Sequence, residues 1–191
     1  MRCILVLDGH PHNDPDHYVH ALASAYIKGA EELHEVRRVD LSKLDFPVLR
    51  DPDDWNSHTA PQGLAKVQEA MRWADHIVIL YPLWLGDVPA LLKAMLEQVA
   101  RPGFAVEPAE NGLYRQLLKG KSARLIVTMG MPAAAYSLFF RAHSVKSFKR
   151  NILHFAGVSP VRLSLMGSVA KSDDYRKTWL RKVERLGRSG R

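Results

Sequence analysis

Histidine and aspartate side chains gather in one short segment near the start of the chain. His10, His12 and His17 alternate with Asp14 and Asp16 in the run GHPHNDPDH, directly after a strongly apolar segment. Imidazole and carboxylate groups bind metals, although this spacing matches no tight zinc signature. Imidazole N–H groups, and the free N–H groups at the start of a following helix, also bind phosphate. The segment is therefore a phosphate site, a metal site or an ordinary polar turn. We favour phosphate and predict no metal.

Large apolar residues follow the buried-type segment His76–Tyr81, at a place where contact with solvent favours polar residues. Pro82 ends that segment, because proline donates no hydrogen bond to a β-ladder. The next three residues are Leu83, Trp84 and Leu85. They either complete the core or contact a ligand at the carboxyl end of a parallel strand, where open α/β sheets bind ligands.

A third segment, which begins Thr128-Met129-Gly130, is small and apolar. Gly130 lets backbone N–H groups come close to a ligand. Tyr136 and His143 are seven residues apart, which places them two turns apart on one side of a helix that includes both. Near a redox-active ring, such a pair stabilises charge that develops during transfer. Each residue taken alone also fits a packed aromatic or a surface histidine.

Five apolar segments alternate with segments of helical periodicity, and this alternation predicts an α/β sandwich with a five-stranded parallel sheet. The expected strands are Cys3–Leu7, His34–Val39, His76–Tyr81, Ala123–Met129 and Val161–Met166. The expected helices are His17–Leu33, Gln62–Ala74, one ending near Val99, Ser137–Phe155 and Ser172–Leu186; Asp87 is expected to cap the third. The segments Leu41–Pro61 and Arg101–Gly120 show no regular pattern. A strand order of 2-1-3-4-5 brings the three loops described above to one edge of the sheet.

The composition fits one domain over residues 1–191, with a formal net charge of +7. No apolar run approaches the roughly 20 residues that span a bilayer, and no signal-peptide pattern precedes the first strand, so we expect a cytoplasmic protein. The single Cys3 excludes an intramolecular disulfide. Much of the positive charge lies in the last 20 residues, on a helix whose apolar side we expect to dock. No nucleic-acid-binding motif accompanies that charge.

A phosphate-binding loop, an aromatic turn and a glycine-containing loop at one edge suit a flat heteroaromatic ring with a phosphate tail, which describes a flavin. The chain resembles the flavodoxin-like NAD(P)H:quinone oxidoreductases, a family that includes quinone reductases and potassium-efflux ancillary flavoproteins. Four segments carry the resemblance: Gly9-His10-Pro11; Tyr81-Pro82-Leu83-Trp84 continuing to Val88-Pro89-Ala90-Leu91-Leu92-Lys93; Val127-Thr128-Met129-Gly130 with Tyr136-Ser137-Leu138; and Asn151-Ile152-Leu153-His154-Phe155-Ala156-Gly157.

The resemblance implies a flavodoxin-like three-layer sandwich and assigns roles to individual residues. His10, His17 and Tyr18 would hold the flavin phosphate and ribityl chain. The ring would contact Pro82, Leu83, Trp84, Leu85, Thr128, Met129, Gly130 and Tyr136. Tyr136 and His143 would be the catalytic pair.

The resemblance also implies an activity: NAD(P)H reduces the flavin, which passes two electrons to a quinone or a similar acceptor. The sequence leaves FMN and FAD open, with FMN slightly preferred, and does not separate NADH from NADPH. The family works as homodimers. The alternative is a regulatory flavoprotein that docks on a membrane transporter through its basic helix, with catalysis incidental.

Overall fold

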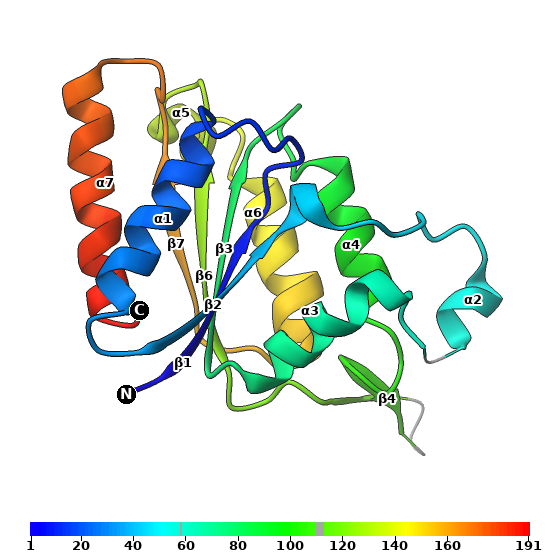
Figure 1. Cartoon of the computed structure of the whole chain (residues 1–191). Coiled ribbons are helices and arrows are strands. Elements are labelled where there is room, and N and C mark those ends of the chain that lie inside the picture. Colours follow the sequence, from blue (N-terminus) through cyan, green and yellow to red (C-terminus); the bar gives the residue numbers. More distant parts are fainter. Residues whose placement is uncertain (58, 110–112) are drawn as a thin grey trace.

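The computed structural model describes residues 1–57, 59–109 and 113–191, and it is built around one parallel sheet (Figure 1). The sheet has five strands in the order β2-β1-β3-β6-β7. Their bounds are Cys3–Asp8 (β1), Glu35–Asp40 (β2), His76–Pro82 (β3), Ser122–Thr128 (β6) and Val161–Met166 (β7). Each expected strand lies within one residue of the observed one at either end, and the predicted strand order is confirmed.

Helices cover both faces of this sheet, as right-handed crossovers require (Figure 1). On one face lie α1 (Tyr18–Ala30) and α7 (Asp173–Arg188), which pack on the cluster containing Val6, Val78 and Ile126. The other face carries a larger cluster. The helices there are α3 (Gln62–Trp73), α4 (Ala90–Val99), α6 (His143–Ser147) and the π-helical segment η2 (Phe148–His154). Among the described residues, no helix is both long and apolar enough to cross a membrane.

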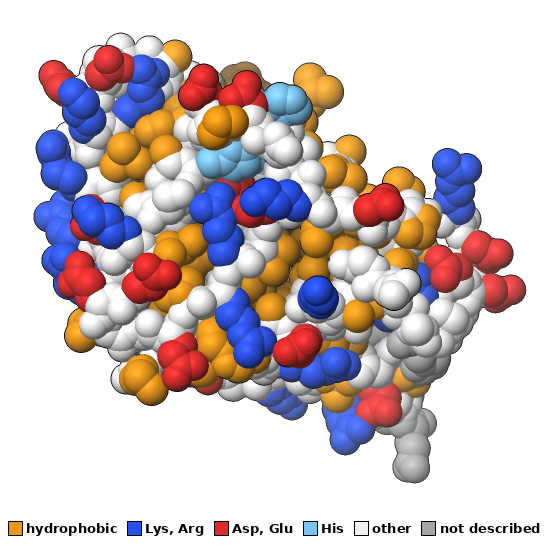
Figure 2. Space-filling model, viewed as in Figure 1, with side chains coloured by type: hydrophobic (Ala, Val, Ile, Leu, Met, Phe, Trp, Pro, Cys, Tyr) orange, Lys and Arg blue, Asp and Glu red, His pale blue; other side chains and the backbone are white. Residues whose placement is uncertain are grey.

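The C-terminal helix docks closely against α1. A Cβ atom at Gly29 would lie 1.9 Å from the Glu184 carbonyl oxygen, and one at Gly187 would lie 2.0 Å from the Tyr26 carbonyl oxygen, so both positions require glycine. Trp179 and Val183 face the core, while Lys and Arg side chains line the outer side of α7 (Figure 2). The expected apolar docking side is therefore confirmed.

Two stretches without an apparent pattern contain regular structure. The first holds η1 (Leu41–Lys43) and α2 (Pro52–Asn56), whose start is capped by the Asp51 carboxylate accepting from Asp53 N at 2.9 Å. The second contains an antiparallel pair, β4 (Val106–Pro108) and β5 (Tyr114–Gln116). These elements are too short to generate a periodic signal in the sequence.

The stretch Ser137–Phe155, which we expected to be mostly helical, is helical in two parts separated by a break that its periodicity does not predict. The chain forms α5 (Ala133–Leu138), then turns through Arg141 and Ala142, whose φ values are 53° and 50°, before α6 begins. Positive φ lies outside the right-handed helical region, so the helix cannot continue through these residues. Residues in α5 and α6 therefore do not share one helix face.

Candidate functional site

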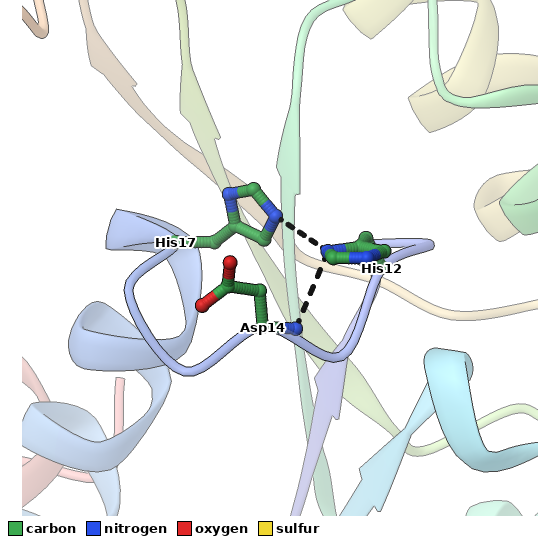
Figure 3. Close-up of side chains that lie close together, drawn as sticks. All are labelled: His12, Asp14 and His17. Atoms are coloured by element: carbon green, nitrogen blue, oxygen red, sulfur yellow. Dashed lines mark hydrogen bonds between the residues drawn. The ribbon is translucent and has the colours of Figure 1, made fainter.

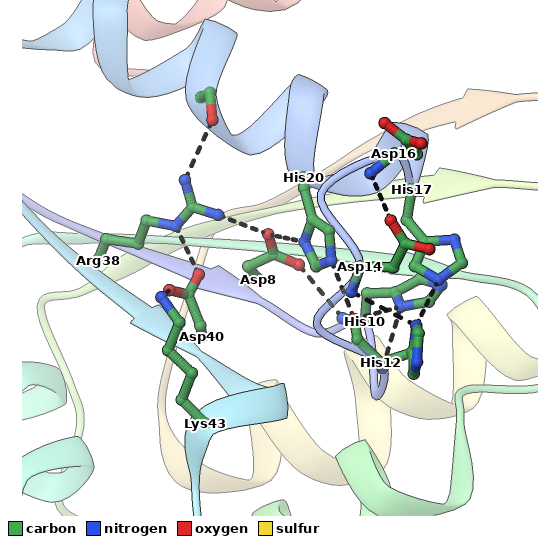
Figure 4. Close-up of polar contacts among 11 residues, drawn as sticks. Asp8, His10, His12, Asp14, Asp16, His17, His20, Arg38, Asp40 and Lys43 are labelled. Carbon is green, nitrogen blue, oxygen red and sulfur yellow. Dashed lines mark hydrogen bonds and ion pairs between the residues drawn. The ribbon is translucent and has the colours of Figure 1, made fainter.

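The first loop is anchored by a carboxylate at the end of β1 (Figure 4). Asp8 is fully buried, and its Oδ2 accepts from His20 Nδ1 at 2.6 Å and from Arg38 Nη2 at 3.0 Å. Its Oδ1 accepts from the His10 main-chain N–H at 3.3 Å. Sequence reasoning missed Asp8, His20 and Arg38; the available signal was an acidic residue directly after an apolar strand. This network ties the start of the loop to α1 and β2.

Four histidines pack together around this anchor. The rings of His10 and His17 stack with centroids 3.9 Å apart, and His20 meets His10 edge-on at 5.3 Å. His12 Nδ1 lies 3.0 Å from His17 Nε2 and also accepts from Asp14 N at 3.4 Å (Figure 3). Burial lowers the pKa of His10. The loop therefore concentrates imidazole nitrogens, the most exposed of them on His12 and His17.

The possible metal ligands in this loop are His12, Asp14 and His17, whose ligand atoms all lie within 4.8 Å of one another. Two imidazoles and one carboxylate are ligand types that Zn²⁺ accepts. The same imidazoles, as N–H donors, suit an oxyanion. The phosphate and metal options that the sequence left open are thus both compatible with the geometry of this loop.

Helix α1 begins at the same place. His17 is its N-cap, no side chain caps it, and no acidic residue lies in its first turn. The main-chain N–H groups of Tyr18 and Val19 are available to an anion, whereas that of His20 donates to the His17 carbonyl at 2.9 Å. The Tyr18 hydroxyl donates to the Arg176 carbonyl at 2.5 Å, so the side chain is committed to α7 and only the main-chain N–H of Tyr18 is left for a ligand. Burial raises the pKa of Tyr18 to about 12.

The second loop is a tight turn. Trp84 N and Asp87 N each donate to the other residue's carbonyl oxygen at 2.9 Å, and the two residues between them, Leu85 and Gly86, have φ values of 48° and 82°. Trp84 is half exposed and Leu85 is fully exposed. Leucine rarely adopts positive φ, and apolar side chains at a turn tip are costly in water. The turn therefore presents apolar surface outward.

Asp87 does not cap α4, contrary to expectation. The turn holds it in place, its Oδ1 accepts from Val88 N at 2.7 Å, and Pro89 is the N-cap. Pro82 and Leu83 lead into the turn partly buried, and Leu83 N donates to the Thr128 carbonyl at 2.8 Å. That bond fixes the second loop against the end of β6.

The third loop exposes mainly main-chain atoms that a ligand could contact. Thr128 and Met129 have buried side chains, whereas Gly130 is exposed and a Cβ atom there would meet nothing within 4 Å. Tyr136 is 2% exposed, and its hydroxyl lies 2.7 Å from Ser144 Oγ. His143 is exposed at the start of α6. The break between α5 and α6 removes the shared helix face on which the Tyr136–His143 pairing was based.

The three loops converge at the carboxyl ends of β1, β3 and β6. His10 and Trp84 are in contact, with ring centroids 5.6 Å apart, and the Leu83–Thr128 hydrogen bond joins the second loop to the third. The chain leaves β1 toward β2 on one side and passes from β3 to β6 on the other, so the junction is the topological switch point of the sheet.

Two adjoining hollows lie along α4, and the smaller one borders the aromatic turn. One, of about 440 Å³, lies between Trp84, Leu85 and residues of α4, α6 and η2. A larger one, of about 580 Å³, lies between α2, α4 and η2, and both are lined by Lys93 and Ile152. The apolar turn is thus continuous with a long hollow along α4.

Comparisons with known proteins agree with this geometry. Residues 2–186 match the family described as having a flavodoxin-like fold. The chain is 27% identical over 179 residues to an uncharacterized NAD(P)H oxidoreductase of Haemophilus influenzae, covering 89% of this chain and 86% of that protein. It is 30% identical over 153 residues to an FMN-dependent NADH:quinone oxidoreductase of Alteromonas mediterranea, covering 73% of this chain and 74% of the relative.

A shorter match, 38% identical over 73 residues, covers 38% of this chain and 37% of the potassium-efflux ancillary protein KefG of an Enterobacter strain. Among solved structures, an NAD(P)H:quinone oxidoreductase of Methanothermobacter marburgensis superposes with a TM-score of 0.81 over 97% of this chain and 96% of its own, at 22% identity, which shows the shared fold. The strand order, the loops at the switch point and the family match agree: the chain belongs to the family of proteins with a flavodoxin-like fold.

Proposed function

We propose that this protein is an NAD(P)H oxidoreductase that uses FMN and passes two electrons to a quinone or a similar acceptor. The observation that carries the proposal is the exposed apolar turn at Trp84–Leu85, which contacts His10 at the switch point of the sheet. The names of the relatives in Haemophilus and Alteromonas support the reaction type and the cofactor.

The phosphate of FMN fits the first loop. The uncapped first turn of α1 supplies free N–H groups, and His17 and His12 present imidazole nitrogens beside it. Such a helix start binds phosphate through its N–H groups and its dipole. His10, fixed by Asp8 through its main-chain N–H, lies on the inner side of this loop and orients His17 by stacking.

The flavin ring fits the second and third loops. The turn from Leu83 to Leu85 offers apolar and aromatic surface, and Gly130 leaves the space that a side chain would fill. The two loops are held in place at the ends of β3 and β6 by Pro82, Thr128 and Met129. Tyr136 supports the third loop from the core, because its buried hydroxyl is hydrogen-bonded to Ser144 Oγ in α6.

A bound flavin supplies the ring that accepts a hydride from NAD(P)H and delivers two electrons to the acceptor. The chain's contribution is to hold the phosphate, orient the ring and exclude water with apolar side chains. His143 remains a candidate for charge stabilisation, now from an exposed site at the start of α6.

Reconstitution tests the proposal. Apoprotein is titrated separately with FMN and FAD, and oxidation of NADH or NADPH is followed with a benzoquinone acceptor. We expect the protein to retain a yellow flavin and to bind FMN more tightly than FAD. We also expect the absorbance of the reduced nicotinamide at 340 nm to fall only when the quinone is present. Failure to bind either flavin contradicts the proposal, whichever nucleotide is supplied.

We further propose a cytoplasmic homodimer. Exposed apolar side chains follow the third loop at Leu138 and Phe139, which are 80% and 82% exposed. Exposed apolar patches of this kind mark protein interfaces. Light scattering after size exclusion should give twice the chain mass, and Phe139→Ser should shift it toward the monomer, whereas Leu33→Ser, at a distant exposed leucine, should not.

The regulatory alternative is supported by the partial KefG match and by the solvent-facing basic side of α7. It predicts that a transporter partner binds through this helix. Changing Lys177 and Arg181 to Gln would then abolish co-purification with membranes and leave quinone reduction intact. Retained co-purification in that variant counts against docking through α7.

A further inference from the structure

A group of arginines lies at the amino ends of the strands, opposite the edge that carries the loops. Arg2 precedes β1, Arg124 and Arg162 lie near the starts of β6 and β7, and Arg191 lies beyond α7. Arg2, Arg162 and Arg191 line a hollow of about 260 Å³, together with His76 and Ser122. The chain termini lie at this same end of the molecule (Figure 1).

The strand register places the cations on one face of the sheet. Arg124 pairs directly with Arg162, and it also pairs with Val78, two residues beyond His76. Because side chains alternate along a strand, His76, Arg124 and Arg162 all point to the face covered by α1 and α7. Like charges directly opposite on neighbouring strands are destabilising unless a counter-charge is present.

No Asp or Glu side chain supplies that counter-charge within the described part of the chain, because no ion pair there includes any of the four arginines. Arg124 is 7% exposed and donates to the main-chain oxygen of Arg191 at 2.7 Å and to Ser164 Oγ at 2.7 Å. Arg2 donates to the Gly190 carbonyl at 2.9 Å. A buried guanidinium without an anion is costly.

Two buried polar groups beside these cations also lack partners. His76 is 2% exposed; its Nδ1 lies 2.8 Å from Ser122 Oγ, and its Nε2 has no hydrogen-bond partner among the residues that the structure describes. The Tyr26 hydroxyl, fully buried in α1, has none either. Burial and then the charges of Arg2, Arg124 and Arg162 lower the pKa of His76 to about 4, so its ring is neutral near pH 7. Unpaired buried polar groups call for an explanation such as a bound ion.

We propose that this hollow binds an oxyanion, phosphate or sulfate, either free or as the phosphoryl group of a small metabolite. Arg2, Arg162 and Arg191 supply the charge, and the free Nε2–H of His76 supplies a neutral donor. The Ser122 hydroxyl donates to His76 Nδ1 and so holds the ring in the tautomer that carries this N–H. An anion there neutralises the Arg124–Arg162 pair. Strands of six residues separate this site from the flavin loops by about 20 Å, so both sites can be filled together.

Calorimetric titration of the FMN-saturated protein with inorganic phosphate tests the proposal, because the flavin then occupies the other phosphate site. We expect saturable binding and a shift of the His76 imidazole signals in NMR spectra. Arg162→Gln, at an exposed position that should not affect folding, should weaken phosphate binding about tenfold or more. The control Arg150→Gln removes an exposed arginine elsewhere and should change the affinity for phosphate less than about twofold.

A second titration, with glycerol phosphate, distinguishes the two sources of the anion. Equal or tighter binding identifies a phosphoryl group of a metabolite, and weaker binding identifies the free ion. If phosphate leaves the His76 signals unchanged, or binds only when FMN is absent, the proposal is wrong. The arginines are then balanced within the chain itself, for which a carboxyl group on Arg191, beside Arg124, is well placed.

Discussion

The imidazole of His10 meets the indole of Trp84 edge to face, with ring centroids 5.6 Å apart and planes inclined at 84°. These residues are far apart in the sequence and lie in the loops that follow two neighbouring strands, β1 and β3. The contact joins the phosphate-type loop to the apolar turn. A substitution of either residue should therefore change the affinity for a single ligand that contacts both loops.

Replacing Trp84 with Ala should weaken FMN binding about tenfold. The substitution removes aromatic surface at the proposed ring site and the partner of His10, and aromatic contacts of this kind contribute about 1 kcal/mol beyond area burial. Quenching of FMN fluorescence on titration measures the change. Leu33→Ala, at an exposed leucine beyond the end of α1, is the matched control, and equal affinities in the two variants would contradict the proposed ring site.

Replacing Asp8 with Asn should lower the free energy of unfolding by about 3 kcal/mol. The carboxylate is fully buried, and its loss leaves Arg38 and His20 without their buried partner, which is the costly way to break such a pair. Urea denaturation gives the value. Asp174→Asn, at an exposed position in α7, should stay within about 0.5 kcal/mol of the parent. A similar small effect at Asp8 would mean that the network does not anchor the loop.

Acid should destabilise the fold through His76. Its pKa is lowered to about 4 in the folded chain, mainly by burial, so the unfolded chain binds this proton first as the pH falls below about 6.5. Stability should therefore fall between pH 6.5 and 4, by about 3 kcal/mol from this group.

The variant His76→Asn lacks the titration and should show a flatter dependence of unfolding free energy on pH across that window. His10, whose pKa is also lowered by burial, contributes in the same direction in both proteins and cancels in the comparison. The measurement requires phosphate-free buffers. Parallel curves for the two proteins would exclude His76 as a source of acid sensitivity.

Replacing Leu85 with Asn should separate stability from function. Leu85 is fully exposed at φ 48°, a conformation that asparagine tolerates better than leucine, so the melting temperature should rise with a gain of about 0.5 kcal/mol. The same change removes apolar surface from the turn and should weaken FMN binding severalfold. Thermal melts and flavin titration on one preparation test both effects. An increase in flavin affinity would show that Leu85 does not face the ring.

The sequence alone was sufficient for the main sheet and its order. Segments such as Cys3–Leu7 and Ile77–Tyr81 are apolar throughout because central parallel strands are buried on both faces, and that pattern is local and easily recognised. Alternation of strands with helices then restricts the topology to few arrangements. The convergence of the loops after β1, β3 and β6 followed directly from that order.

Tertiary structure alone decided the features that depend on partners distant in the chain. The break at Arg141–Ala142, the β4–β5 pair and the burial of the Tyr136 hydroxyl have no periodic signature, because each is fixed by contacts with other segments. The same holds for the Asp8–His20–Arg38 network and for the arginines around His76. Apolar periodicity records which residues are buried, whereas the pairing of charges depends on which buried segments the fold brings side by side.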